Sequence, residues 1–250
     1  MNYESCFDAL KNAGHALALT GAGVSTLAGI PDFRGKNGIF KNQTSFEGYA
    51  LEQMFYAAFF EEHPEVFYRY ANEFWYPLIR NSAPGIAHLT LAELEQKGYI
   101  KQLFTQNIDT LHTKGGSRDV QELHGSFQHH YCMRCGKEMP WSAVTQAVES
   151  NQLPYCEKCH GLVKPGVIFY GDNLNQALLR HAFKEFERAD ILLIMGSTLT
   201  VQPVASLPLL TLDNGGKLII VNDGATELDD HATWRFTDIA EFCCEINKFQ

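Results

Sequence analysis

The sequence lacks the features that mark several large protein classes. Its apolar runs are short, such as Ile191–Met195, far below the roughly 18 residues of a membrane-spanning helix. The N-terminus, MNYESCFDALKNAGH, has no charged start followed by an apolar stretch, as a secretory signal would. Lys and Arg total 20 against 29 Asp and Glu, a formal charge of −9, with no basic cluster of the kind that binds nucleic acid. We therefore expect a cytoplasmic protein that binds neither membranes nor nucleic acid, and whose acidic surface favours cationic partners such as lysine-rich peptides.

The apolar pattern predicts an α/β fold. At 250 residues and 45% apolar composition, the chain suits one large domain, or one domain carrying an inserted module. Five short apolar runs read as buried strands: His15–Thr20, Ile100–Thr105, Val167–Tyr170, Asp190–Met195 and Lys217–Val221. Three segments have apolar residues at helical spacing: Ala87–Lys97, Leu174–Arg188 and Asp238–Lys248. Strands alternating with helices predict a parallel sheet with helices on both faces.

Two stretches interrupt this alternation. Residues Phe46–Trp75 are rich in aromatic side chains and read as helical with a break near Pro64. Residues 128–164 show little regular pattern and hold four paired cysteines, so they read as a small insert that a metal ion stabilises.

The cysteine spacing is the strongest local signal. Two C-x2-C pairs, separated by 20 residues, can direct four thiolates at one tetrahedral zinc ion; they are Cys132, Cys135, Cys156 and Cys159. A redox dithiol or two disulfides are the alternatives, and His129, His130 and His160 are near enough in sequence to replace a cysteine. Four cysteines leave no coordination position for water, which indicates a structural and not a catalytic zinc.

A glycine-rich turn follows the first predicted strand. In Gly21-Ala22-Gly23-Val24-Ser25-Thr26, backbone N–H groups at the start of a helix can hold a pyrophosphate. The same residues can also form a purely structural turn. Thr26 stands where the dinucleotide fingerprint of dehydrogenases has Gly or Ala, which argues against hydride transfer. The hydroxyls of Ser25 and Thr26 are candidate phosphate ligands.

Further polar residues cluster after predicted strands, where ligand sites of open α/β sheets lie. The segment Gln106-Asn107-Ile108-Asp109 indicates a polar ligand, although an Asx turn capping a helix would explain it too. His124, in the sequence ELHG, is a candidate general base. Phe33 and Arg34 lie in a loop near the glycine turn, and Gly196-Ser197-Thr198 and Asn222-Asp223 follow two later strands.

Taken together, these motifs resemble the sirtuin (Sir2) family of NAD-dependent protein deacylases, in its minimal-length bacterial and archaeal form. The elements that match are GAGVSTLAGIPDFRG, TQNIDTLH, ELHG, the paired CxxC turns, KPGVIFYGD, GSTLTVQP and IVN, in the family's order. The resemblance implies a Rossmann-like large domain formed by residues 1–35, 81–127 and 165–250. A helical module (36–80) and a zinc module (128–164) would form the small domain, with NAD and an acyl-lysine peptide meeting in the cleft between them.

The resemblance also implies a role for each matching residue. The residues implied to bind NAD are Ala22, Thr26, Phe33, Arg34, Gln106, Ile108, Asp109, Gly196, Ser197, Thr198, Asn222 and Ile239. Among them Phe33 would cover the nicotinamide ribose, Asp109 would bind the nicotinamide amide, and the last four would contact the adenosine half. His124 and Asn107 would be catalytic, His124 as the base. Ile168, Phe169 and Gly171 would line the lysine tunnel and pair with the peptide backbone.

The implied reaction begins when the acyl oxygen of the substrate lysine attacks the ribose carbon that carries nicotinamide. His124 then removes a proton from a ribose hydroxyl, and free lysine, nicotinamide and O-acyl-ADP-ribose result. Family members that prefer succinyl or malonyl groups carry a Tyr-x-x-Arg pair in the helical module. Here Arg69 is preceded three residues earlier by Val66, which predicts a preference for acetyl or other neutral acyl groups.

Three other functions are weighed against deacylation. A mono-ADP-ribosyltransferase would use the same cleavage of nicotinamide but modify a protein side chain. A zinc-ribbon binding module would explain the cysteines but not TQNID, GAGVS or ELHG. Hydride transfer is disfavoured by Thr26.

Overall fold

The parallel sheet expected from the sequence forms the centre of the protein. The structure, a computed structural model, describes residues 2–33, 35, 38–42 and 44–249. Six strands lie in the order β11-β10-β9-β1-β4-β5, and all neighbours pair in parallel. In chain order they are β1 (Ala16–Thr20), β4 (Gln102–Thr105), β5 (Val120–Glu122), β9 (Ile191–Met195), β10 (Lys217–Val221) and β11 (Ala232–Phe236). No helix among the described residues is long and apolar enough to cross a membrane.

Helices cover both faces of this sheet because successive strand residues point to opposite sides. From β1, Ala16 and Ala18 pack with α1 (Tyr3–Asn12), α7 (Ile86–Gln96) and α12 (Ile239–Phe249). Leu17 and Leu19 face the other layer, which contains α10 (Gln176–Arg188) and α11 (Leu207–Asp213). Every residue of β1 and β9 is buried, as expected for strands covered on both faces. The three helices predicted from the sequence are confirmed within two residues at each end.

The prediction of a sheet strand at Val167–Tyr170 is wrong. The strand is β8 (Val163–Val167), and it belongs to a separate antiparallel sheet with β6 (Gly125–Cys132) and β7 (Glu138–Met139). Its residues alternate between buried and half-buried, as in a sheet covered on one face only. The short edge strands β5 and β11 were not predicted.

The aromatic stretch is helical only in part. It begins with a small hairpin, β2 (Ser45–Phe46) and β3 (Tyr49–Ala50). The helices that follow are a 3₁₀ turn (Leu51–Phe55), α4 (Ala57–Glu62), α5 (Pro64–Tyr70), a π-helical turn (Ala71–Trp75) and α6 (Tyr76–Asn81). The predicted break at Pro64 is confirmed, because α4 ends at Glu62 and α5 begins at Pro64. Proline is well tolerated at the first position of a helix, where the backbone N–H has no partner within the helix.

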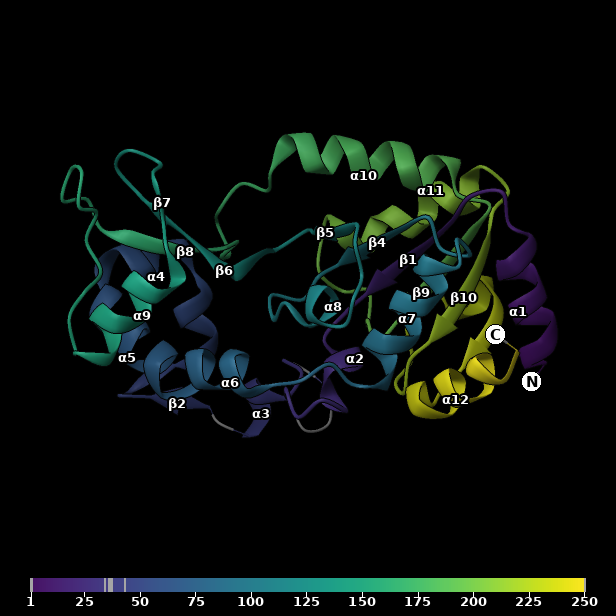
Figure 1. Ribbon diagram of the computed structural model, residues 1–250, viewed down its shortest axis with the longest axis horizontal. Helices are drawn as coiled ribbons and strands as arrows, with labels where there is room; N and C mark the ends of the chain where they lie inside the picture. Colours follow the sequence, from purple (N-terminus) through teal and green to yellow (C-terminus); the bar gives the residue numbers. More distant parts are fainter. Residues whose placement is uncertain (1, 34, 36–37, 43, 250) are drawn as a thin grey trace.

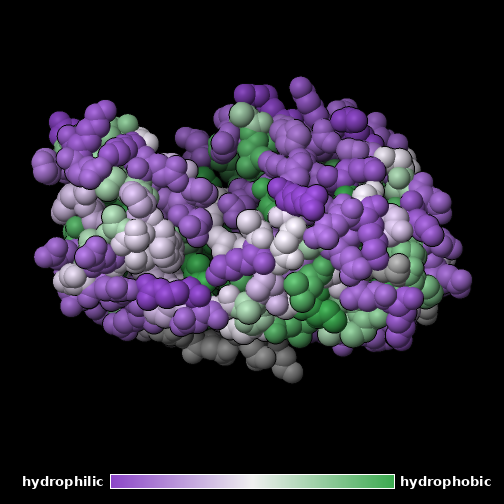
Figure 2. All heavy atoms as spheres, viewed as in Figure 1, coloured by the Kyte–Doolittle hydropathy of each residue, from purple (hydrophilic) through white to green (hydrophobic). Residues whose placement is uncertain are grey.

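The aromatic segment and the cysteine-bearing segment share one hydrophobic core, distinct from the two that flank the main sheet. This core also contains residues of α9 (Trp141–Glu149). It lies at the left of Figure 1, whereas the main sheet and both chain termini lie at the right. The space-filling view shows a notch between the two halves (Figure 2). The short helices α2 (Gly23–Thr26), α3 (Ile39–Asn42) and α8 (Leu111–Lys114) complete the part of the fold nearest to the site described below.

Candidate active site

Two glycine-rich turns meet at the carboxyl ends of β1 and β9. The N–H of Gly23 donates to the carbonyl of Gly196 over 2.9 Å, and that of Gly21 donates to Met195 over 3.0 Å. A Cβ atom on Gly196 would lie 2.5 Å from the backbone nitrogen of Val24, and its φ of +67° also favours glycine. The backbone of GAGVST is thereby fixed against that of GST, so the first turn is a structural turn as well as the start of α2.

Gln106 contacts three parts of the site through hydrogen bonds: the end of β1, the turn after β9 and His124. Its backbone N–H donates to Thr20 at the end of β1 over 2.9 Å, and its side-chain oxygen accepts from the hydroxyl of Ser197 over 2.7 Å. Its carbonyl lies 3.1 Å from Nδ1 of His124. The structure therefore brings together three residues that the sequence analysis placed in one site, although they are far apart in the chain.

The tautomer of His124 follows from this contact. A carbonyl oxygen only accepts hydrogen bonds, so Nδ1 must carry the hydrogen, and Nε2 is the nitrogen able to accept a proton. Burial lowers the pKa of His124 below its usual value, although the hydrogen bond to Gln106 opposes the shift. His124 is therefore neutral at physiological pH, as a general base must be.

Asn107 and Asp109 lie in a buried hydrogen-bond network. Asp109 is 5% exposed, and its carboxylate accepts from the Ser25 hydroxyl over 2.6 Å and from the N–H of Leu111 over 2.9 Å. The side-chain amide of Asn107 donates to Ser25 over 3.1 Å. Ser25 is 1% exposed, so its hydroxyl serves this network, and the interpretation of Ser25 as a phosphate ligand is wrong.

The remaining residues implied to bind NAD are distributed around these two networks. Ala22 is the N-cap residue of α2, and Thr26 is its last residue. Thr26 is exposed, and its hydroxyl donates to the carbonyl of Gly23. Phe33 stacks on Trp75 with ring centres 5.8 Å apart, and Arg34 lies outside the described residues. Thr198 is exposed beside Thr200.

Asn222 and Ile239 lie beyond the ends of β10 and β11. Asn222 is buried, and its N–H donates to the carbonyl of Phe236 at the end of β11 over 3.0 Å. Ile239 begins α12 and packs half-buried against the core on that face of the sheet. Ile108 is buried, and its carbonyl accepts from the N–H of Phe127.

The segment after β8 runs past His124. The N–H of Ile168 donates to the carbonyl of His124 over 2.9 Å. The N–H of Phe169 donates to the carboxylate of Asp172 over 2.8 Å, and that of Tyr170 donates to Phe55 over 2.7 Å. Asp172 also pairs with Lys164, whose ammonium group lies 4.3 Å from the centre of the Phe169 ring. A peptide strand added here must therefore bond to other backbone groups, such as those of the exposed Gly171.

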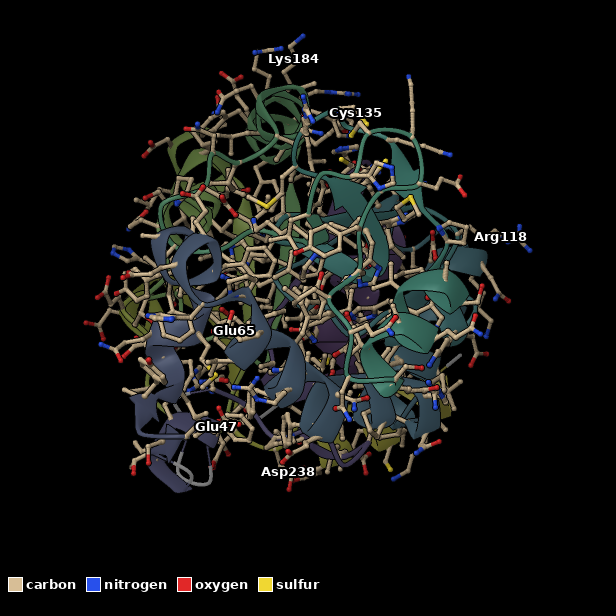
Figure 3. All side chains as sticks on the ribbon, turned by 90° about the vertical axis from the view of Figure 1, so that its left-hand side faces the viewer. Glu47, Glu65, Arg118, Cys135, Lys184 and Asp238 are labelled. Carbon is tan, nitrogen blue, oxygen red and sulfur yellow. The ribbon has the colours of Figure 1, made fainter. Side chains whose placement is uncertain are left out.

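The four predicted cysteines converge as a zinc site requires. Their sulfur atoms all lie within 4.8 Å of one another, and the Cys132–Cys159 and Cys135–Cys156 pairs are 3.4 and 3.8 Å apart. Burial alone would raise the pKa of the Cys132 thiol, but backbone hydrogen bonds from Cys135 and Arg134 lower it to about 6. At Cys159, burial and hydrogen bonds to the other three thiols outweigh a backbone hydrogen bond from Gly161 and raise the pKa to about 12, so the four thiols share their protons as one cluster. Figure 3 shows Cys135 with neighbouring sulfur atoms near the edge of the molecule.

The neighbouring histidines do not join this cluster. His129 pairs with Glu138 over 2.6 Å, and Nε2 of His130 contacts the hydroxyl of Tyr76 over 3.0 Å. All the cysteines of the chain are free thiols, so the disulfide alternative is wrong in this structure. The geometry and the thiol chemistry fit a structural zinc ion held by four cysteines.

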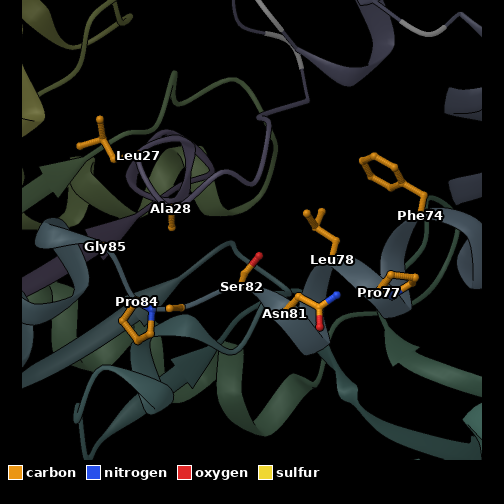
Figure 4. A pocket seen from close by; sticks show the side chains of 10 residues that line it. Leu27, Ala28, Phe74, Pro77, Leu78, Asn81, Ser82, Pro84 and Gly85 are labelled. Atoms are coloured by element: carbon orange, nitrogen blue, oxygen red, sulfur yellow. The ribbon is translucent and has the colours of Figure 1, made fainter.

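Two surface hollows lie near these networks. The larger, about 590 Å³, is lined by Leu27, Ala28, residues 81–85 and parts of α6 and the π-helical turn (Figure 4). None of the residues predicted to bind NAD or peptide lines it. The second, about 460 Å³, is lined by Thr198, Thr200, Ala225, Thr226 and Glu227, so it includes one residue implied to contact adenosine.

Comparison with known proteins agrees with this geometry. A model of the Sir2 family matches residues 21–203. The NAD-dependent protein deacetylase of Thermotoga maritima is 44% identical over 247 residues, covering 98% of this chain and 97% of its own. The NAD-dependent protein deacylase 1 of Archaeoglobus fulgidus is 38% identical, covering 90% and 88%. A Sir2 structure with a deacetylated p53 peptide and 3′-O-acetyl-ADP-ribose is 42% identical, with a TM-score of 0.91 and coverage of 100% and 98%.

The Thermotoga maritima relative matches nearly the whole chain and the family model matches residues 21–203, and both matches include the glycine turn and the segment that contains His124. The resemblance stated from the sequence motifs is confirmed, as is the Rossmann-like arrangement of the main sheet. The protein belongs to the Sir2 family.

Proposed function

We propose that this protein is an NAD-dependent protein-lysine deacetylase. The observation that carries the proposal is His124, which Gln106 holds through Nδ1 so that Nε2 can accept a proton. The chain that contains His124 is also 44% identical, over almost its full length, to the NAD-dependent protein deacetylase of Thermotoga maritima. Acetyl-lysine, NAD and water would yield lysine, nicotinamide and O-acetyl-ADP-ribose.

NAD, when bound, would supply a ribose joined to nicotinamide, and cleavage of that bond would open the ribose carbon to attack by the acyl oxygen. His124 then takes the proton of a ribose hydroxyl at Nε2, and its lowered pKa keeps it ready for this at neutral pH. Asn107 and Asp109, held by Ser25, would orient the nicotinamide half. These roles are supported by the proximity of the residues at the ends of β1, β4 and β9.

The substrate peptide would lie along residues 168–171. Phe169 is 2% exposed within an aromatic core, a surrounding that suits an uncharged acyl group better than a charged one. Arg69 is engaged by Glu47 through two hydrogen bonds of 2.8 and 2.6 Å. This supports the preference for acetyl over succinyl groups.

We further propose the division into a large domain (1–35, 81–127, 165–250) and a small domain (36–80, 128–164). Its support is that residues of the helical and zinc segments share one core. Free thiols poised for zinc agree with a reducing compartment such as the cytoplasm.

Mass spectrometry of an acetyl-lysine peptide incubated with the protein, with and without NAD, tests the function. We expect deacetylated peptide and O-acetyl-ADP-ribose only with NAD, and neither from a His124→Ala variant. The alternative, mono-ADP-ribosyl transfer, predicts instead an unchanged peptide and a protein heavier by one ADP-ribose. The Sir2 structure that contains an acetyl-ADP-ribose favours deacetylation.

A further inference from the structure

Trp75 is the largest of the fully buried side chains, and none of the roles above uses it. It is 2% exposed and is the last residue of the π-helical turn Ala71–Trp75. Turns of this kind are rare and occur frequently at functional sites. Its neighbour in the turn, Phe74, lines the surface hollow of Figure 4, whereas Trp75 does not. Trp75 therefore belongs to the core that the helical and zinc segments share.

Three aromatic rings meet at this position, and we call them the ring triangle: Phe33, Phe55 and Trp75. The centres of each pair of rings lie 5.8 Å apart, which is contact distance for aromatic side chains. Phe55 also contacts Phe169, with ring centres 6.0 Å apart. Phe33 is implied to cover the nicotinamide ribose, and Phe169 is implied to line the lysine tunnel. An acyl group that enters between these two residues therefore meets the ring triangle.

The packing around Trp75 leaves its ring little freedom to move. The ring stacks on that of Phe127, with centres 5.5 Å apart, and lies edge-on to that of Phe74, with centres 5.1 Å apart. Phe127 is fully buried on β6, and its N–H donates to the carbonyl of Ile108. A core packed in this way admits additional methylene groups only if side chains are displaced.

The indole N–H indicates that stability alone does not explain a tryptophan here. Among the described residues, none accepts a hydrogen bond from the buried Nε1 of Trp75. A buried donor without an acceptor lowers the stability of the fold, and an aliphatic side chain such as leucine would avoid that cost. What tryptophan supplies at this position, and leucine would not, is the size of its ring.

We propose that Trp75 is a specificity-determining residue that closes the inner end of the acyl tunnel and limits the substrate to acyl groups of two or three carbons. A longer chain must displace a ring of the triangle. A smaller residue at position 75 would let the chain extend toward Phe74 and the hollow of about 590 Å³ that Phe74 lines. The inference rests on the proposed function and adds to it the length of the acyl group.

Peptides that carry acetyl-, butyryl- or octanoyl-lysine test this limit. In the unaltered protein, we expect kcat/KM to fall at least about tenfold from acetyl to octanoyl, since forcing extra methylene groups into a packed core has about this effect. In Trp75→Leu, the ratio of octanoyl to acetyl kcat/KM should rise at least about tenfold, because each CH₂ group that becomes buried contributes about fourfold. Trp75→Phe should give an intermediate ratio.

The matched control is Trp141→Leu, which makes the same substitution elsewhere in the same core. Trp141 is partly buried, and within the part of the chain that the structure describes its ring contacts Tyr76 and His130, not the ring triangle. Its replacement should lower the unfolding midpoint, as Trp75→Leu does, but leave the ratio of octanoyl to acetyl kcat/KM unchanged.

The acyl series on the unaltered protein needs no variant that folds. If that protein cleaves octanoyl-lysine as fast as acetyl-lysine, the proposal is overturned. An unchanged ratio in Trp75→Leu, or an equal rise in Trp141→Leu, would overturn it too. If Trp75→Leu does not fold, Trp75→Phe takes its place in the comparison. Failure of the unaltered protein to cleave acetyl-lysine would instead contradict the proposed function itself.

Discussion

Removal of the zinc ion should unfold the part of the chain that carries the substrate segment. The strand β6 begins one residue after His124, and β8 ends one residue before Ile168. Both strands belong to the small sheet that leads to the cysteine cluster, and Cys132 is the last residue of β6. Loss of the metal should therefore displace both His124 and Ile168, which lie at the ends of these strands.

The expected size of the effect follows from the sulfur positions. A tetrahedral zinc ion with bonds of about 2.3 Å places its sulfur ligands about 3.8 Å apart. The Cys132–Cys159 and Cys135–Cys156 sulfur distances of 3.4 and 3.8 Å are close to that value. Binding of structural zinc is worth about 10–16 kcal/mol in small zinc-binding peptides. This is as large as the whole stability of many domains, which is about 5–15 kcal/mol. The small sheet should therefore not remain folded without the metal.

The assay compares untreated protein, protein treated with a chelator, and Cys135→Ser. We expect about one zinc per chain in the untreated protein, and in the other two a lower unfolding midpoint and little deacetylase activity. Added zinc should restore activity after chelation only. The matched control is Cys244→Ser, since Cys244 is exposed and outside the cluster. Metal-free protein with unchanged midpoint and activity would refute the reasoning, as would an equal loss in the control.

Three further predictions concern the site. Burial lowers the pKa of His124, so kcat/KM for deacetylation should stay level as the pH falls to about 6.5, the usual histidine pKa, and decline only below that pH. A decline in kcat/KM with its midpoint above pH 6.5 would contradict this prediction. Asp172→Asn should raise the KM for acetyl-peptide about fivefold, because it weakens a partly exposed, charge-assisted hydrogen bond from the N–H of Phe169 that is worth about 1 kcal/mol. The control is Glu47→Gln, which breaks an exposed ion pair with Arg69 and should leave the KM for acetyl-peptide unchanged. Acetyl-peptide should be cleaved faster than succinyl-peptide in a competition assay, and the reverse order would contradict the preference for neutral acyl groups.

The parts of the site that the sequence predicts are those with local signals. The zinc ligands follow from the spacing within each CxxC pair, and the helices follow from the spacing of apolar residues. The strand at Val167–Tyr170 was misplaced because a short apolar run does not say which sheet it joins. Its true neighbour, β6, is identified only by pairing across the chain.

The hydrogen-bond network was out of reach for a similar reason. Ser25 is separated from Asn107 by 82 residues and from Asp109 by 84. The tautomer of His124 likewise depends on Gln106, 18 residues earlier. Only the folded chain shows these partners.

The most direct test of the central claim is the stoichiometry of a single reaction mixture. With acetyl-lysine peptide and NAD, quantified together by mass spectrometry, the account predicts equal amounts of free lysine peptide, nicotinamide and O-acetyl-ADP-ribose. Nicotinamide formed while the peptide stays acetylated would contradict the account. Deacetylation that proceeds without NAD, with free acetate as the product, would contradict it equally.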